Sequence, residues 1–352
     1  MKRIKLNWTT RVFAILSVIS GSSVAAEIVK PSEGELAAYK ELFKPALLDL
    51  SDQPRSAVDQ AKVDLGRALY YDKRLSKDDT ISCNSCHNLE AYGVDNQQFS
   101  PGVGGTLGGR NSPTSYNAYA HIAQFWDGRA STVEEQAKGP ILNPVEMAMP
   151  SSDAVIAKLK GIEGYTEMFE KAFPESKDPV NYNHVGLAIG AFERNLTTPS
   201  RFDQFLNGST SALTDLELKG SKVFVTKGCV TCHSGTLLGG QTYQKLGLVK
   251  AWPNSKDVGR FEVTGNEADK MMFKVPSLRN VEKTGPYFHD GSSDSLEDAV
   301  KKMAKHQLGQ ELSCEELDSL MAFLKSLTGT IPADYVAEPE LPGAAFGGFD
   351  SF

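Results

Sequence analysis

Three features are missing from this sequence. It has no stretch rich in lysine and arginine, which argues against a nucleic-acid partner. It shows no convincing run of alternating polar and apolar residues, so strands are not expected to dominate the fold. The apolar centre of its N-terminal segment, residues 12–19, is far shorter than the roughly 20 residues that cross a bilayer. With 40% hydrophobic and 23% charged residues, the 352-residue chain is predicted to be globular and mainly α, with about two domains and no membrane span in the mature protein.

The first 26 residues have the order of a secretory signal peptide. A basic start is followed by the apolar centre VFAILSVI and the small residues SSVAA, which end before Glu27. We expect cleavage after Ala25 or Ala26 and export to the periplasm; an uncleaved anchor is the alternative. Removing four of the 37 basic residues leaves 33 against 44 acidic ones, a net charge of about −11. Such a charge suits a basic soluble partner, because complementary charge speeds encounter.

Cysteine and histidine are scarce, but their placement is informative. The chain has five cysteines and six histidines, and four of the cysteines form two CxxCH motifs, ISCNSCH and GCVTCH. In such a motif both thiols add to the vinyl groups of haem and the histidine ligates the iron. Two disulfide bridges or one zinc site are the alternatives, but each leaves the histidines without a role. We therefore predict two covalently bound haem c groups, held by Cys83, Cys86, His87, Cys229, Cys232 and His233.

Helical patterns surround both motifs and divide the chain into two haem modules. Thr214 and Glu217 form a capping box ahead of the second motif, and Ser313 and Glu316 form another near the end of the chain. The fifth cysteine, Cys314, is expected to be a buried small hydrophobe. The stretches that favour helix are residues 63–76, 152–172, 182–196, 214–228, 295–309 and 313–329.

This pattern indicates two cytochrome c-like haem domains in tandem. The TTPSRFD stretch at residues 197–203 is typical of a junction, and the Pro/Gly-rich end is typical of a mobile segment. The predicted divisions are a signal peptide at 1–26, an N-terminal haem domain at 27–198, a C-terminal haem domain at 199–335 and a flexible tail at 336–352.

The sixth ligand of each haem iron decides what that haem can do. A filled position gives an electron carrier, whereas an open position binds peroxide or oxygen. Spacing alone does not choose a ligand. The candidates are His121, His184, His289, His306, Met147, Met149, Met168, Met271, Met272, Met303 and Met321.

The sequence resembles the bacterial di-haem cytochrome c peroxidases over nearly the whole mature chain. The motifs that carry the resemblance are, in order, ISCNSCH, GRNSPT, QFWDGRA, NPVEM, CVTCH, KVPSLRN, GPYFHDG and MAKHQLG. The resemblance implies that the N-terminal haem reacts with hydrogen peroxide. It also implies that the C-terminal haem accepts electrons from a small carrier, a reduced cytochrome c or a cupredoxin, and that the chain forms a homodimer.

The matched motifs also imply roles for single residues. Met303 would be the axial ligand of the C-terminal haem iron, where a thioether raises the reduction potential relative to histidine. Trp126 would lie between the haems and couple them. Glu146 would be the acid/base carboxylate of the peroxide pocket, since O–O cleavage needs one group to move a proton between the two oxygens. Gln136 would be its polar companion.

The resemblance further implies a calcium ion between the domains. Its ligands would be Asn111 and the backbone carbonyls of Thr284 and Pro286, and oxygen ligands suit a hard cation. His289 belongs to a matched motif but is assigned no role beyond the haem surroundings.

One departure from the family pattern concerns the loop after the first CxxCH motif. Many members carry there a histidine that blocks the peroxidatic iron until the other haem is reduced, but residues 96–111 contain none. We therefore expect an N-terminal haem that is open at rest and an enzyme that needs no reductive gating; His121 is the alternative blocking ligand. Two other functions remain as alternatives, a plain di-haem carrier and a maturase-like di-haem enzyme, the latter having tyrosine where this chain has Met303.

Overall fold

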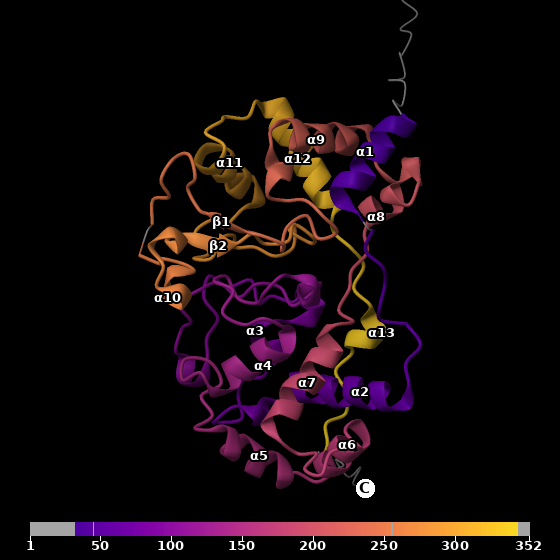
Figure 1. Ribbon diagram of the computed structural model, residues 1–352, viewed down its shortest axis with the longest axis vertical. Coiled ribbons are helices and arrows are strands. Elements are labelled where there is room, and N and C mark those ends of the chain that lie inside the picture. Colours follow the sequence, from indigo (N-terminus) through magenta and orange to yellow (C-terminus); the bar gives the residue numbers. More distant parts are fainter. Residues whose placement is uncertain (1–31, 45, 255, 344–352) are drawn as a thin grey trace, which may run out of the picture.

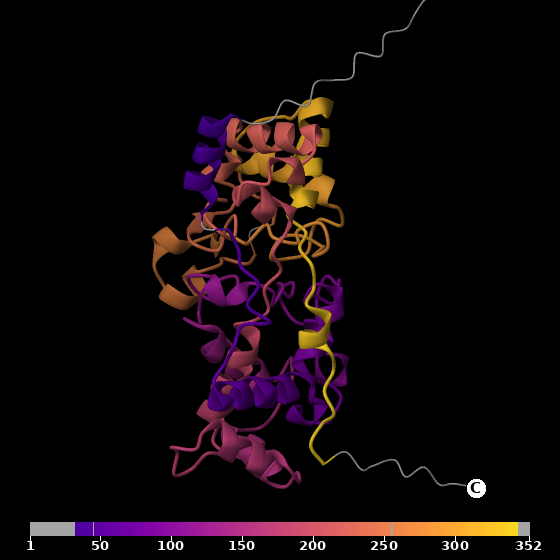
Figure 2. The same ribbon diagram turned by 90° about the vertical axis from the view of Figure 1, so that its right-hand side faces the viewer.

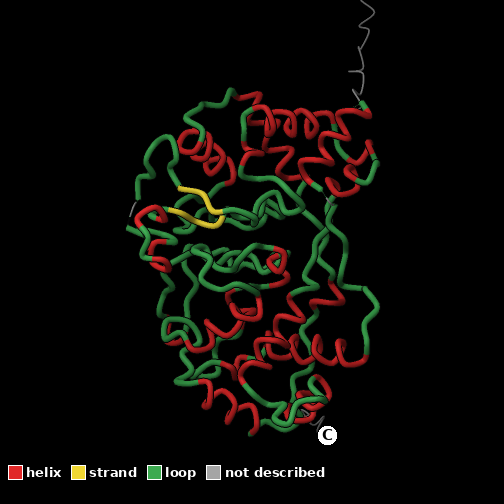
Figure 3. The backbone as a smooth tube through the Cα atoms, in the orientation of Figure 1, coloured by secondary structure: helices red, strands yellow, loops and turns green. Residues whose placement is uncertain are grey.

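The computed structural model describes residues 32–44, 46–254 and 256–343. The predicted signal peptide lies outside these residues. Two helical lobes are stacked along the long axis, and the layers that face each other are mostly loop (Figures 1 and 3). The expected mainly α fold in two modules is confirmed. In the part of the chain that is described, no helix has the length and apolar character needed to cross a membrane.

The lower lobe holds the first CxxCH motif and the upper lobe holds the second. The helices of the lower lobe are α2 (Ala57–Tyr71), α3 (Cys83–Cys86), α4 (Val133–Leu142), α5 (Ser152–Lys160), α6 (Tyr165–Ala172), α7 (Tyr182–Glu193) and α13 (Ala333–Val336). The elements of the upper lobe are α1 (Glu33–Phe43), α8 (Arg201–Leu206), α9 (Asp215–Thr226), β1 (Tyr243–Lys245), α10 (Phe261–Thr264), β2 (Met272–Lys274), α11 (Leu296–Gln307) and α12 (Cys314–Ser326). Short 3-10 turns cover Lys73–Leu75, Leu89–Ala91, Val103–Gly105, Ala118–Ala120, Thr210–Ala212, Cys229–Thr231 and Glu267–Asp269.

A small sheet accompanies the helices. Strands β1 and β2 pair antiparallel, with Tyr243 opposite Lys274 and Lys245 opposite Met272. Each strand has only three residues, which is too short to show an alternating pattern in the sequence.

Most predicted helix starts are found where the capping signals lie. The capping boxes of Thr214 with Glu217 and of Ser313 with Glu316 are both formed. The single helix expected over 152–172 is wrong, because the chain turns at Gly164, whose φ of +92° is left-handed, and α5 and α6 are separate.

Two expectations about α12 also differ from the structure. The helix ends at Ser326, and Gly329 is instead needed where two segments meet, since a Cβ there would lie 2.0 Å from the Thr198 carbonyl oxygen. Cys314 is exposed because it occupies the first turn of α12, before the buried face begins at Leu317. The expectation that it is buried is wrong.

Each lobe is built on one close helix crossing. In the lower lobe, Gly66 of α2 lies so near α7 that a Cβ would stand 1.9 Å from the Ala188 carbonyl oxygen and 3.0 Å from the Phe192 Cβ. In the upper lobe, Gly220 of α9 approaches α12 in the same way, at 1.8 Å from the Ser319 carbonyl oxygen. Only glycine permits such an approach.

Each end of the described chain packs on the lobe built mainly from the opposite half of the sequence. Helix α1, near the N-terminus, packs on the upper lobe, and α13, near the C-terminus, packs on the lower lobe. Tyr39 and Phe43 of α1 are buried in the upper core with Phe202 and Phe323. Val336 of α13 is buried in the lower core, where the segment running down from α12 follows one side of the lobe (Figure 2). The predicted domain ranges remain a prediction, and they do not anticipate this exchange of ends.

Candidate functional site

The second CxxCH motif opens onto a largely apolar cavity in the upper lobe. The Nδ1–H of His233 donates to the Leu238 carbonyl oxygen at 3.0 Å, which leaves Nε2 free to ligate a metal. Burial lowers the pKa of His233 to about 4, so its imidazole is neutral. The cavity is lined by Cys229, Cys232, His233 and Met303 together with the apolar side chains of Leu246, Phe273, Leu296, Val300, Leu320 and Leu324.

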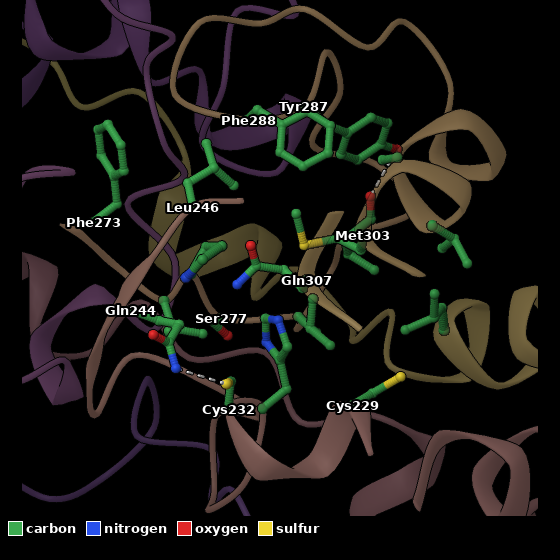
Figure 4. A pocket seen from close by; sticks show the side chains of 18 of the residues that line it. Cys229, Cys232, Gln244, Leu246, Phe273, Ser277, Tyr287, Phe288, Met303 and Gln307 are labelled. Atoms are coloured by element: carbon green, nitrogen blue, oxygen red, sulfur yellow. Dashed lines mark hydrogen bonds between the residues drawn. The ribbon is translucent and has the colours of Figure 1, made fainter. Parts of the chain in front are cut away.

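Met303 lies across this cavity from the cysteines. It is carried by α11 and reaches the shared space from one wall, while Cys229 and Cys232 lie on the other (Figure 4). Among the described residues that the sequence offered as sixth ligands, Met303 is the methionine in this wall, and His121 and His289 line the same cavity. The thioether therefore faces the same space as the histidine of the motif.

The first CxxCH motif is held in a similar way in the lower lobe. Helix α3 contains both cysteines, and the Nδ1–H of His87 donates to the Pro113 carbonyl oxygen at 2.9 Å. The Tyr70 hydroxyl donates to the His87 carbonyl oxygen at 2.8 Å. Burial lowers the pKa of His87, which again gives a neutral imidazole whose Nε2 is available.

The chemistry of the cysteines argues against the disulfide and zinc alternatives. All five cysteines are free. Burial raises the pKa of Cys86 and of Cys229 to about 11. The two pairs lie in different lobes, and within the described ranges no three His, Cys, Asp or Glu side chains gather closely enough to hold a metal ion. The donor set and the apolar wall fit haem c.

Glu146 lies in a separate, open cavity on the lower lobe. The cavity is lined by Phe125, Arg129, Asn143 and Glu146, among others. Burial raises the pKa of the Glu146 carboxyl, while the charge of Arg129 and a hydrogen bond from Asn143 act in the opposite direction. The carboxylate is close enough to Cys83 and Cys86 to raise the pKa of both thiols.

The backbone at Glu146 is fixed from two sides. The Val103 amide donates to the Glu146 carbonyl oxygen at 2.8 Å, and the Lys77 amide donates to the Met147 carbonyl oxygen at 2.9 Å. Gly102 is required at this point, because a Cβ would lie 2.2 Å from the Val145 carbonyl oxygen. The loop at 96–111 and the segment before the first motif therefore hold Glu146 in place together.

Gln136 and Trp126 have different surroundings. Gln136 is half-buried on α4, but the wall of the Glu146 cavity includes its neighbour Glu135 rather than Gln136 itself. Trp126 lines the upper cavity at the boundary between the lobes, and its Nε1–H donates to the Asn111 carbonyl oxygen at 2.8 Å. Its ring centroid is 6.4 Å from that of His289.

The three residues of the expected calcium site lie on the wall of one cavity. Asn111, Thr284 and Pro286 all line the upper cavity. The Asn111 Nδ2 donates to the Gln97 carbonyl oxygen at 2.9 Å, which turns its Oδ1 to the other side. Among the described residues, no donor bonds the carbonyls of Thr284 and Pro286. Three free oxygens of this kind fit a hard cation.

Sequence reasoning did not find the charged residues that join the lobes. Arg110 donates to Asp127 at 2.5 Å within the lower lobe, and to Asp257 at 2.6 Å and Glu262 at 3.1 Å across the boundary. Partly buried, hydrogen-bonded ion pairs in which one guanidinium bonds several carboxylates favour one geometry. The arginine stands in the matched motif GRNSPT, but a motif does not reveal a partner about 150 residues away.

The comparisons with known proteins agree with this geometry. A family model for di-haem cytochrome c peroxidase matches residues 60–211, and one for cytochrome c matches residues 218–328. The chain is 46% identical to the cytochrome c551 peroxidase of Nitrosomonas europaea over 80% of this chain and 84% of that protein. It is 47% identical to a cytochrome c peroxidase of Escherichia coli over 77% of this chain but only 59% of that longer protein.

A solved structure has the same architecture. A MauG-like protein associated with microbial copper homeostasis superimposes with a TM-score of 0.73 and 29% identity, covering 83% of this chain and 98% of that one. Haem c is the cofactor of the matched families. Both CxxCH motifs and most of each lobe fall within the matched residues, and the chain therefore belongs to the di-haem cytochrome c peroxidase family.

Proposed function

We propose that this chain is a cytochrome c peroxidase that reduces hydrogen peroxide to two waters with two electrons from a small reduced cytochrome c or cupredoxin. The observation that carries the proposal is the contrast between the two cavities. A half-buried carboxyl, that of Glu146, lines an open cavity within electrostatic reach of the first CxxCH motif, whereas Met303 faces the second. One haem would then be free to react, and the other would only carry electrons.

The chain's own residues would move the protons. Each haem, when bound at its CxxCH motif, supplies an iron that exchanges one electron at a time and, on the His87 side, the position for peroxide. Glu146 takes the proton from the peroxide oxygen nearer the iron and returns it to the leaving oxygen. Two electrons and two further protons complete the balance, giving two waters. Burial favours this role because it raises the proton affinity of the carboxylate.

Arg129 would lower the pKa of the Glu146 carboxyl by its positive charge. Its guanidinium lies 3.4 Å from the centre of the Phe125 ring and donates to Asp127 at 3.0 Å, so it is held beside the cavity. Burial raises the pKa of the Glu146 carboxyl, and the charge of Arg129 acts in the opposite direction, which favours the ionised form that can accept a proton. Gln136 would assist only if its side chain turned toward the cavity.

Electrons would enter at the upper lobe. Met303 would be the axial ligand of the haem on His233, and its thioether would make that haem a ready acceptor. Trp126, whose backbone carbonyl accepts from the Lys274 amide at 2.8 Å, would couple the upper haem to the lower one. A plain carrier needs no acid/base group, and the maturase-like alternative has tyrosine at the position of Met303.

Reductive gating would be unnecessary in this enzyme. The loop at 96–111 contains no histidine. The alternative blocking ligand, His121, lines the upper cavity, and its Nδ1 accepts a hydrogen bond from the Lys274 ammonium. We propose an N-terminal haem that is open at rest. The test is peroxide-dependent oxidation of a reduced small cytochrome c by the as-isolated, fully oxidised protein. Turnover from the first seconds is expected; turnover that starts only after reduction of the C-terminal haem would contradict the open state.

Several finer points belong to the same proposal. We propose covalent attachment of both haems, calcium at Asn111, Thr284 and Pro286, export to the periplasm after cleavage near residue 26, and a homodimer. The mass of the mature protein measures the first and third of these together, since two haems add mass and the lost signal peptide removes it. Metal analysis and light scattering measure the calcium content and the oligomeric state.

A further inference from the structure

One arginine bonds carboxylates of both lobes. The Nη1 of Arg110 donates to Asp127 of the lower lobe at 2.5 Å, and its Nε and Nη2 donate to the two oxygens of Asp257 of the upper lobe at 2.6 and 2.7 Å. The Arg110 side chain is 17% exposed and that of Asp127 only 4%. A bidentate bond of this kind is both stronger and more directional than a single one. Among the described residues, the ion pairs that cross between the lobes are those of Arg110.

The same arginine is linked to both ends of Trp126. The carbonyl oxygen of the next residue, Asn111, accepts from the Trp126 Nε1–H at 2.8 Å. The residue that follows the tryptophan is Asp127, whose carboxylate accepts from the Arg110 side chain. The dipeptide Arg110–Asn111 therefore holds the indole of Trp126 and the backbone beside it at once.

The upper lobe also holds this segment through its backbone. The Lys274 amide donates to the Trp126 carbonyl oxygen at 2.8 Å, and the Arg260 Nη1 donates to the Asp127 carbonyl oxygen at 3.0 Å. The Arg260 guanidinium in turn lies 4.2 Å from the centre of the Tyr243 ring. Trp126 therefore has a defined position against the upper lobe, and the bonds from Arg110 supply the charged part of that attachment.

We propose that Arg110 is a positioning residue for electron transfer between the lobes: its bonds to Asp127 and Asp257 fix Trp126 relative to the upper cavity. Trp126 lines that cavity together with Cys232. A functional side chain works only when its neighbours hold it to within about 0.5 Å, and the coupling of two redox centres falls steeply as the gaps between them widen. In the step concerned, one electron leaves the upper haem and enters the lower one, and no covalent bond changes. The inference rests on the electron route of the proposed function.

The test follows the C-terminal haem of the holoprotein when this haem alone has been reduced and peroxide is added without a donor. Its oxidation, recorded by stopped-flow absorbance, then reports electron transfer to the N-terminal haem. In Arg110→Gln the rate at saturating peroxide should fall by about 10-fold or more, because a displacement of about 1 Å is enough for such a loss. The rate at limiting peroxide and both reduction potentials should stay unchanged. An unchanged rate at saturating peroxide, or a slower rate that follows a changed potential, would overturn the inference.

The matched control removes a different carboxylate from the same guanidinium. Glu262 accepts from Arg110 at 3.1 Å but is 54% exposed, so Glu262→Gln should keep the rate of the unmodified protein. Asp257→Asn keeps an oxygen for the Gly259 amide but loses the bidentate bond, and it should slow the transfer as Arg110→Gln does. This variant decides the matter if Arg110→Gln does not hold both haems. Equal rates in Asp257→Asn and Glu262→Gln would reject the proposal.

A measurement without peroxide separates this inference from the proposed function. The Lys274 amide, which donates to the Trp126 carbonyl oxygen, should exchange its hydrogen faster in Asp257→Asn than in Glu262→Gln, because a released Trp126 segment breaks this bond more often. Hydrogen-exchange mass spectrometry of the holoprotein measures the difference, and equal exchange would overturn the inference. An unmodified protein whose C-terminal haem stays reduced in peroxide would contradict the proposed function and leave the exchange test intact.

Discussion

The two lobes share a scaffold but differ in what surrounds the histidine of the CxxCH motif. Gly66 in one lobe and Gly220 in the other allow the same close helix crossing. Beside the first motif, loops supply Glu146, Arg129 and an open cavity, whereas a helix supplies Met303 to the second. Under the proposed function, the repeated helices would hold the haems, and the non-repeated segments would decide which haem reacts with peroxide and which carries electrons.

Removing the carboxylate from the reactive side should have the largest effect. Glu146→Gln keeps the size of the side chain but cannot move a proton, so peroxide turnover should fall by about 100-fold or more, with both haem spectra unchanged. Steady-state oxidation of a reduced cytochrome c measures this. The control is Glu135→Gln, which changes an exposed carboxylate in the wall of the same cavity. Similar losses in the two variants would remove Glu146 from the mechanism.

Making the conducting side resemble a bis-histidine site should have the next largest effect. In Met303→His, imidazole replaces the thioether, and the potential of the C-terminal haem should fall by more than about 60 mV, a tenfold change for one electron. Spectroelectrochemical titration measures the change. Electron uptake from the donor should slow accordingly, while the other haem keeps its spectrum. An unchanged potential would mean that Met303 does not ligate the iron.

The shared crossing can be tested in both lobes by adding one methyl group. Gly66→Ala and Gly220→Ala each place a Cβ less than 2 Å from a carbonyl oxygen of the facing helix, so each should destabilise the protein by about 1–3 kcal/mol. Gly34→Ala in α1 is the control, because a Cβ there meets nothing within 4 Å and alanine favours helix over glycine. Thermal or denaturant unfolding gives the ranking. Destabilisation by only one of the two crossing variants would show that the scaffolds are not equivalent, and no destabilisation by either would contradict the close packing.

The smallest expected effect concerns the pH dependence of the reactive side. Burial raises the pKa of Glu146 and the charge of Arg129 lowers it. Because only the ionised carboxylate accepts a proton, kcat/KM should fall as the pH decreases through this pKa. In Arg129→Gln the pKa rises further, so the acid limb should move to higher pH. Arg201→Gln, whose arginine pairs with Glu217 in the upper lobe, should leave the limb where it is. A limb that moves to lower pH in Arg129→Gln would contradict the assigned electrostatics.

The sequence predictions that succeeded depend on patterns formed by residues close to one another in the sequence. The CxxCH motifs and the capping boxes of Thr214 and Ser313 depend on neighbours two or three positions apart, and both are visible in the sequence. The turn at Gly164 was missed because helical residues flank it on both sides. The bonds from Arg110 to Asp257 and from Lys274 to His121 were missed because each joins residues about 150 positions apart. Such contacts exist only after the two lobes have met.

The packing of α1 on the upper lobe and of α13 on the lower lobe affects the order in which the protein can fold. The core of the upper lobe needs Tyr39 and Phe43, which are synthesised early, whereas the core of the lower lobe needs Val336, which is synthesised almost last. Domains usually fold one after another as they emerge from the ribosome. Here neither core is complete until the chain is nearly finished, because each core combines residues from early and late parts of the sequence. The two lobes therefore complete their folding together and late, rather than one after the other.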